Sequence, residues 1–177
     1  MEGAGPWPRP ARLATLPRMR ILPGTLWLAV VFAAACDDGG SAPPVDTEPA
    51  VVELGTGEHP TRFEPLEDEQ QVWITAGLQG GHHIWGSFKA EHVEPLNLNM
   101  RFALYDGDRQ IGAADYIDEV RRGPTGSYEY GGVTVFLWDD TPPASIDGRA
   151  IRMTLEIEDA RGRVASDART VIARCCE

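Results

Sequence analysis

Basic residues are scarce in this chain. Its 177 residues include 16 lysines and arginines against 27 aspartates and glutamates, a formal charge of −11. Proteins that bind nucleic acid electrostatically need clustered basic side chains that displace counterions from phosphates. The charge balance therefore argues against a nucleic-acid partner.

Long apolar runs are also missing. The longest apolar stretch is Ile21–Ala35, which has 15 residues and contains Pro23 and Gly24, whereas a membrane-spanning helix needs about 20. Four arginines precede this stretch and three alanines end it, which is the order of a secretory signal. We therefore predict that residues 1–35 are an export signal peptide and not a transmembrane helix. Met19 opens a compact signal by itself, so both Met1 and Met19 remain candidate start residues.

Cysteine occurs only three times, and the first cysteine directly follows the predicted signal. Ala33-Ala34-Ala35-Cys36 resembles a bacterial lipobox, in which small residues fit the lipoprotein signal peptidase. The resemblance implies that the Cys36 sulfur carries a diacylglyceryl group and that Cys36 becomes the mature N-terminus. Each methylene buried in the bilayer contributes roughly 0.8 kcal/mol to the free energy of membrane binding, so two or more acyl chains anchor a protein stably. We expect an exported protein anchored by lipid to a bacterial cell membrane, with the inner and the outer membrane both open.

The other two cysteines, Cys175 and Cys176, are adjacent near the C-terminus. An exported protein meets an oxidising compartment, where thiols tend to pair. Three interpretations stay open for this pair: a strained vicinal disulfide, one buried and one exposed thiol on opposite faces of a strand, and a soft-metal site.

The segment after Cys36 has the composition of a flexible tether. Residues 37–50 contain four acids, three prolines and two glycines, with Val45 as their one bulky aliphatic residue. Such a composition cannot bury enough apolar surface to fold, so residues 36–50 are predicted to be the lipidated cysteine and a flexible acidic linker. Without residues 1–35 the chain has 12 basic and 26 acidic residues, a formal charge of −14. This balance favours solubility and disfavours anionic partners.

From Val51 onward the apolar residues follow a period of two. One run places Leu96, Leu98, Met100, Phe102 and Leu104 on one face, and another does the same with Ile151, Met153, Leu155 and Ile157. Alternation of this kind is typical of antiparallel strands with one face in a core. Further short strands are expected at 51–54, 62–66, 72–76, 84–90, 109–113, 133–138 and 164–175. We predict an all-β domain over residues 51–177, an antiparallel β-sandwich of immunoglobulin-like or fibronectin-like architecture, with a closed barrel as the alternative.

The most unusual stretch is Gly-Leu-Gln-Gly-Gly-His-His at 77–83. The side chains of His82 and His83 leave a strand on opposite faces, so both reach one metal only if the strand is bulged. One of them with His92, His59 or an acid makes a candidate two- or three-ligand site for copper or zinc. A structural glycine-rich hairpin is the simpler interpretation. A third is a polar ligand pocket lined by Gln79, His83, Trp85 and Lys89.

Three tryptophans lie on expected strands. Trp73, Trp85 and Trp138 are either core side chains or a surface on which a sugar ring stacks. The sequence leaves both interpretations open.

Three further stretches carry a family resemblance: VELGTG at 52–57, FEPL at 63–66 and GLQGGHHIW at 77–85. Together they are similar to a family of uncharacterised lipoproteins from myxobacteria and related deltaproteobacteria, and the Gln-Gly-Gly-x-His core at 79–83 is their most recognisable part. The resemblance covers most of the mature domain. It implies a lipobox-bearing envelope protein and brings no assigned catalytic residues.

Catalytic motifs are not found in the sequence, which lacks a Gly-x-Ser-x-Gly elbow, a His-Glu-x-x-His motif and a phosphate-binding loop. We therefore expect a lipid-anchored binding or structural module of the cell envelope that is not an enzyme and has no cofactor. Its expected partners are the membrane, through the lipid, and an envelope protein or glycan. The alternative function is a copper- or zinc-binding lipoprotein that uses His82 or His83 with His92.

Overall fold

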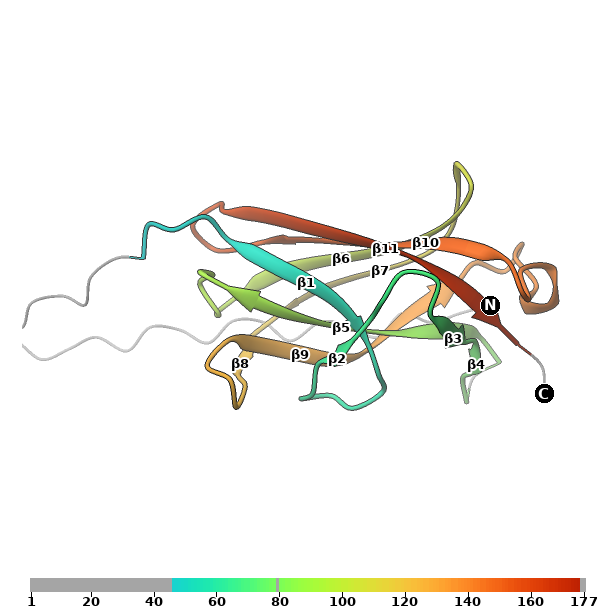
Figure 1. Ribbon diagram of the computed structural model, residues 1–177, viewed down its shortest axis with the longest axis horizontal. Helices are drawn as coiled ribbons and strands as arrows, with labels where there is room; N and C mark the ends of the chain where they lie inside the picture. Colours follow the sequence, from blue (N-terminus) through green and yellow to red (C-terminus); the bar gives the residue numbers. More distant parts are fainter. Residues whose placement is uncertain (1–45, 79, 176–177) are drawn as a thin grey trace, which may run out of the picture. The chain divides into compact units, whose positions relative to one another are not determined.

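The computed structural model describes residues 46–78 and 80–175 (Figure 1). The regular secondary structure of this part of the chain is strand, apart from a single 3-10 turn at Pro143–Ser145. The strands are β1 (Val51–Thr56), β2 (Glu64–Pro65), β3 (Gln71–Trp73), β4 (Thr75–Ala76), β5 (His82–Glu91), β6 (Leu98–Asp106), β7 (Arg109–Asp118), β8 (Arg121–Arg122), β9 (Tyr128–Leu137), β10 (Ala150–Glu158) and β11 (Val164–Arg174). The prediction of an all-β domain is confirmed.

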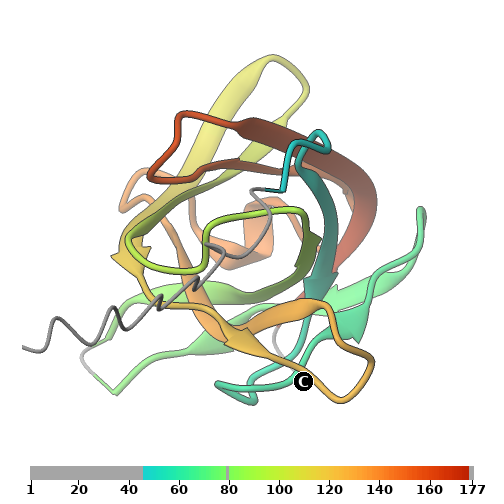
Figure 2. The same ribbon diagram turned by 90° about the vertical axis from the view of Figure 1, so that its left-hand side faces the viewer.

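The strands hydrogen-bond into one continuous sheet, in the order β2-β1-β5-β9-β7-β6-β10-β11-β3, with β4 on β5 and β8 on β9. All pairs are antiparallel except β11 with β3. The sheet curls into a half-barrel around its core, as the view along the strands shows (Figure 2). The hydrogen-bond ladder thus joins all these strands in one curled sheet. The predicted immunoglobulin-like or fibronectin-like sandwich of two sheets stays a prediction.

The two alternating runs seen in the sequence form the centre of the core. The apolar rows of β6 and β10 face inward, and each of these side chains is at most 1% exposed from Leu98 to Leu104 and from Ile151 to Ile157. Their register pairs Phe102 with Leu155 across the two strands. Apolar cross-strand pairs of this kind stabilise a sheet in addition to the backbone ladder.

Two details differ from the sequence-based prediction. Leu96 is 50% exposed and lies outside β6, because Asn97 has a φ of 55° and turns the chain before the strand begins. The predicted strand 72–76 is split at Ile74 into β3, which pairs with β11, and β4, which pairs with β5. The N–H of Ile74 donates to the carbonyl of Arg174 at 2.8 Å where the chain passes from one partner strand to the other.

A β-bulge sets the register between β5 and β9. The pairing shifts at residues 86–88 of β5, where β9 has one extra residue. Gly132 lies at this point with a φ of 66°, a conformation that favours glycine. Beyond the bulge Val135 points into the core, so its neighbours Thr134 and Phe136 point out of the sheet. The bulge therefore decides which β9 side chains lie beside β5 on the outer face.

A carboxylate joins the two sides of the curled sheet. β1 and β11 lie side by side, and the N–H of Leu54 donates to the Asp167 carboxylate at 2.8 Å. Arg169 forms an ion pair with Asp167 and donates from Nε to the carbonyl of Leu66 at 3.0 Å. These contacts satisfy polar groups at the place where β1 and β11 meet without a backbone ladder.

Candidate functional site

An aromatic hollow lies on the outer face of the sheet where β4, β5 and β9 run side by side. The register places Thr75, His83 and Phe136 in one row across the three strands, with Trp85 and Thr134 paired in the next row. The hollow has a volume of about 500 Å³, and the β4–β5 loop completes its wall. We call it the aromatic hollow, and its larger side chains are those of Thr75, Leu78, His83, Trp85, Thr134 and Phe136.

His83 forms the polar part of the aromatic hollow. The residue is only 4% exposed, and neither ring nitrogen has a hydrogen-bond partner among the described residues. Trp85 contacts the imidazole edge to face, with ring centroids 4.5 Å apart, and Phe136 does so at 5.8 Å. Burial lowers the pKa of His83 below its usual value, and the charge of neighbouring His82 lowers it further. The imidazole is therefore neutral at pH 7, with one donor and one acceptor unused.

A second, smaller hollow adjoins the first at Trp85, which lines both. It has a volume of about 170 Å³, and we call it the side hollow. Its polar side chains are those of Thr56, Glu64 and Gln71, and Trp73 forms a further wall with 48% of its surface exposed. Trp85 thus lines two hollows, of which the first is mainly aromatic and the second combines the apolar walls of Trp73 and Val72 with a few polar side chains.

A third, polar hollow of about 770 Å³ lies at the opposite end of β5. Its charged groups are largely paired with one another. Arg161 binds Glu94 at 3.1 Å, and Arg122 donates to the Tyr128 hydroxyl at 3.2 Å and stacks on its ring. Because these groups already have partners within the domain, the polar hollow is a weaker candidate for a ligand site than the aromatic hollow.

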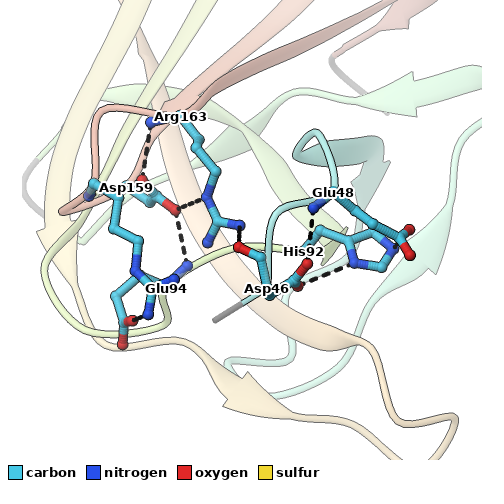
Figure 3. Close-up of polar contacts among 7 residues, drawn as sticks. Asp46, Glu48, His92, Glu94, Asp159 and Arg163 are labelled. Atoms are coloured by element: carbon cyan, nitrogen blue, oxygen red, sulfur yellow. Dashed lines mark hydrogen bonds and ion pairs between the residues drawn. The ribbon is translucent and has the colours of Figure 1, made fainter. Parts of the chain in front are cut away.

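The N-terminal end of the domain is held at the polar hollow (Figure 3). His92 contacts the Asp46 carboxylate through Nδ1 at 3.1 Å and the Glu48 carboxylate through Nε2 at 3.0 Å. Arg163 donates to the backbone carbonyl of Asp46 at 3.3 Å. Residues 46–50, which the composition assigns to the flexible tether, therefore contact the domain just before β1 begins. The rest of the predicted tether and the predicted signal peptide lie outside the described residues.

Asp159 organises the loop between β10 and β11 in the same region (Figure 3). Its carboxylate is fully buried and accepts hydrogen bonds from the N–H groups of Glu94, Arg161 and Arg163, each at 2.9 Å, and from Nε of Arg163 at 2.8 Å. Burial by itself would raise the pKa of this carboxyl, but the hydrogen bonds outweigh it and lower the pKa. Asp159 is thus a structural anion.

The structure separates the histidines that the metal hypothesis brings together. His82 and His83 open β5, whereas His92 follows its last residue, a separation of roughly 30 Å along an extended strand. His83 points to the outer face beside Trp85, and His92 binds two carboxylates of the N-terminal segment. The described residues contain no group of three histidine, cysteine or acidic side chains placed to hold a metal ion.

We expect no copper or zinc site built from these histidines, because the strand length keeps them apart. Titration calorimetry of the full chain with each metal, beside a His82→Ala/His83→Ala variant, measures this directly. The expected result is the same heat for both proteins. Tight binding that disappears in the double variant would contradict the expectation and restore the metal hypothesis.

Other predicted site residues are placed as follows. Trp85 and His83 line the aromatic hollow together, as the ligand-pocket hypothesis requires, whereas Lys89 lies farther along β5 and binds Glu53 at 2.6 Å. Gln79, Cys36 and Cys176 lie outside the described residues. Cys175 is disulfide-bonded and 9% exposed, and its N–H donates to the Asp147 carboxylate at 2.9 Å.

Sequence reasoning missed the part of the hollow that β9 supplies. Phe136 and Trp138 are 47% and 45% exposed, although they lie in an expected strand. The alternation with Val133, Val135 and Leu137 was a signal that both rings face outward. Their position relative to β5 depends on the bulge at Gly132, which no sequence pattern indicated.

Comparison with known proteins finds neither a matching family model nor a matching curated protein. The resemblance to myxobacterial lipoproteins therefore stays a prediction. The part of the chain that the structure describes has no helix with the length and hydrophobicity that a membrane crossing needs.

Proposed function

We propose that this chain is a non-catalytic binding module of the bacterial cell envelope, held at a membrane by lipid on Cys36, and that its ligand occupies the aromatic hollow. The supporting observation is the buried imidazole of His83, which has no partner among the described residues and lies in a hollow with exposed aromatic walls. Ligand sites in proteins are typically concave and mainly apolar, with a few polar groups that fix orientation. The aromatic hollow has this composition. The finer fold assignment, an immunoglobulin-like or fibronectin-like sandwich, is part of the same proposal.

The position of the hollow fits an anchored binding module. Val51, the first residue of β1, pairs with Glu91 at the end of β5, whereas the hollow surrounds His83 near the start of β5. Eight residues of extended strand separate the two points, which is roughly 26 Å. In Figure 1 the start of β1 lies at the left and β3 and β4 lie at the right. The hollow therefore lies at the end of the domain remote from the start of β1, the strand that follows the predicted tether.

Labelling cells with an alkyne analogue of palmitate tests the anchor. We expect the wild-type chain to take up the label and to sediment with membranes, and Cys36→Ser to lose the label, because the thiol that receives the diacylglyceryl group is gone. Cys175→Ser is the matched control and should keep the label. A Cys36→Ser chain that is still labelled would contradict the proposal.

A further inference from the structure

The aromatic hollow and the side hollow together form an elongated surface on the outside of the sheet. Trp85 lines both of them, so a ligand that fills both hollows contacts this residue. Aromatic walls from Phe136 and Trp73 stand on either side, each about half exposed. A ligand with several linked flat units matches this arrangement better than a single small molecule does.

The chemistry of the walls restricts the ligand further. No lysine or arginine is among the described residues that line the two hollows, and Glu64 is the one carboxylate there. The mature chain has a formal charge of −14, so anionic ligands are repelled. The polar groups are neutral or hydrogen-bond-accepting, namely threonine hydroxyls, the Gln71 amide, the His83 imidazole and the Glu64 carboxylate. These groups suit a ligand that is rich in hydroxyls and has no charge.

We propose, on the basis of the function proposed above, that the two hollows bind a neutral glycan, with one pyranose ring in the aromatic hollow and the next in the side hollow. The apolar face of a sugar ring contacts the exposed ring of Phe136 and the partly buried ring of Trp85, and its hydroxyls bond the polar groups around them. The ring in the aromatic hollow supplies a hydroxyl partner to His83. Trp85 and Phe136 both contact the His83 imidazole in edge geometry and cover it. One of these two rings therefore turns aside when the sugar hydroxyl reaches the imidazole.

Titration calorimetry of the full chain in nanodiscs of phosphatidylcholine tests this assignment. The probes are hexasaccharides of β-1,4-glucose, β-1,3-glucose, α-1,4-glucose, β-1,4-mannose and β-1,4-N-acetylglucosamine, with hexagalacturonate as the acidic comparison. We expect at least one neutral hexasaccharide to bind with a Kd below about 1 mM, and its affinity to fall about tenfold in Trp85→Ala and in Phe136→Ala, the loss of one good aromatic contact.

Trp138→Ala is the matched control, because Trp138 directly follows β9 and is 45% exposed but lines neither hollow. Its affinity should equal that of the wild type. If Trp85→Ala fails to fold, Phe136→Ala still tests the proposal. The Phe136 ring is 47% exposed, so its removal leaves the core intact.

Three results would overturn the glycan assignment: no neutral hexasaccharide binds, hexagalacturonate binds as tightly as the best neutral probe, or binding survives both aromatic substitutions. Titration with indole, a neutral aromatic probe, distinguishes failure of the glycan assignment from failure of the proposed ligand site. If indole binds the wild type but not Phe136→Ala, while no hexasaccharide binds, the hollow is a ligand site for another class and only the glycan assignment is wrong. If neither probe binds, both proposals are wrong.

Discussion

Replacing Asp159 by alanine is expected to lower the free energy of unfolding by about 3–5 kcal/mol, the usual cost of removing one partner of a buried charged network. The substitution leaves three backbone N–H groups and the Arg163 guanidinium without their acceptor. These donors lie in a region where the carboxylate itself is fully buried, so water replaces it poorly. Urea unfolding followed by tryptophan fluorescence gives the free energy.

The matched control is Asp115→Ala, because Asp115 also pairs with an arginine but is largely exposed. It accepts from Nε of Arg101 at 3.0 Å with 65% of its side chain exposed. Exposed ion pairs contribute about 0–1 kcal/mol, so this variant should unfold almost as the wild type does. A loss below about 1 kcal/mol in Asp159→Ala would show that the loop rearranges and that Asp159 does not hold it.

The pH dependence of the same variant follows from the direction of the pKa shift. The folded pKa of Asp159 is lower than the unfolded value of about 3.9. The carboxylate therefore contributes its full stability above this value, and the contribution is lost as the pH falls through the folded pKa. The wild type and Asp159→Ala should accordingly converge in stability on acidification below about pH 4.

The alternating runs predicted the centre of the fold because each strand has one buried and one exposed face. Phe102 and Leu155 occupy the inward rows that the sequence indicated, and they pair with each other. The way the sheet curls was not predictable in the same manner. It depends on contacts such as the one between Leu54 and Asp167, which are 113 residues apart in the chain. An acidic residue in a strand gives no sign of which distant N–H group it will bind.

The site was predicted in part for a related reason. His83 and Trp85 are two residues apart in one strand, so they must share a face, and the sequence placed both in one candidate pocket. Phe136 enters the same hollow only through the register between β5 and β9. That register depends on one extra residue at Gly132, a local irregularity that alternation does not reveal. His92 was grouped with His83 by residue type, although the length of β5 separates them.

Acidification from pH 6.5 is expected to destabilise the wild-type domain through His83. The folded pKa of this imidazole is lower than the ordinary value of 6.5, because the charged form is buried without a partner. The unfolded chain therefore binds more protons between the two pKa values, so stability is complete above pH 6.5 and falls as the pH drops toward the folded pKa. A single group changes the free energy of unfolding by at most about 1.4 kcal/mol per pH unit.

His83→Phe removes the titrating group and the two unpartnered nitrogens while keeping an aromatic ring beside Trp85. We expect this variant to be about 1 kcal/mol more stable than the wild type at pH 7, since an apolar ring has no unpaired polar atoms to bury. The decline in stability below pH 6.5 should also be smaller in this variant. Urea unfolding at half-unit steps from pH 5 to pH 8 measures both effects.

His59→Gln is the control, because His59 is exposed and lies outside the aromatic hollow. Its stability should follow the wild-type dependence on pH. If His83→Phe keeps the full decline below pH 6.5, the acid sensitivity belongs to another group. An unpartnered buried histidine weakens the domain unless it serves a ligand. If His83→Phe is more stable at pH 7 and also loses glycan binding, the imidazole therefore serves the ligand and lowers the stability of the fold.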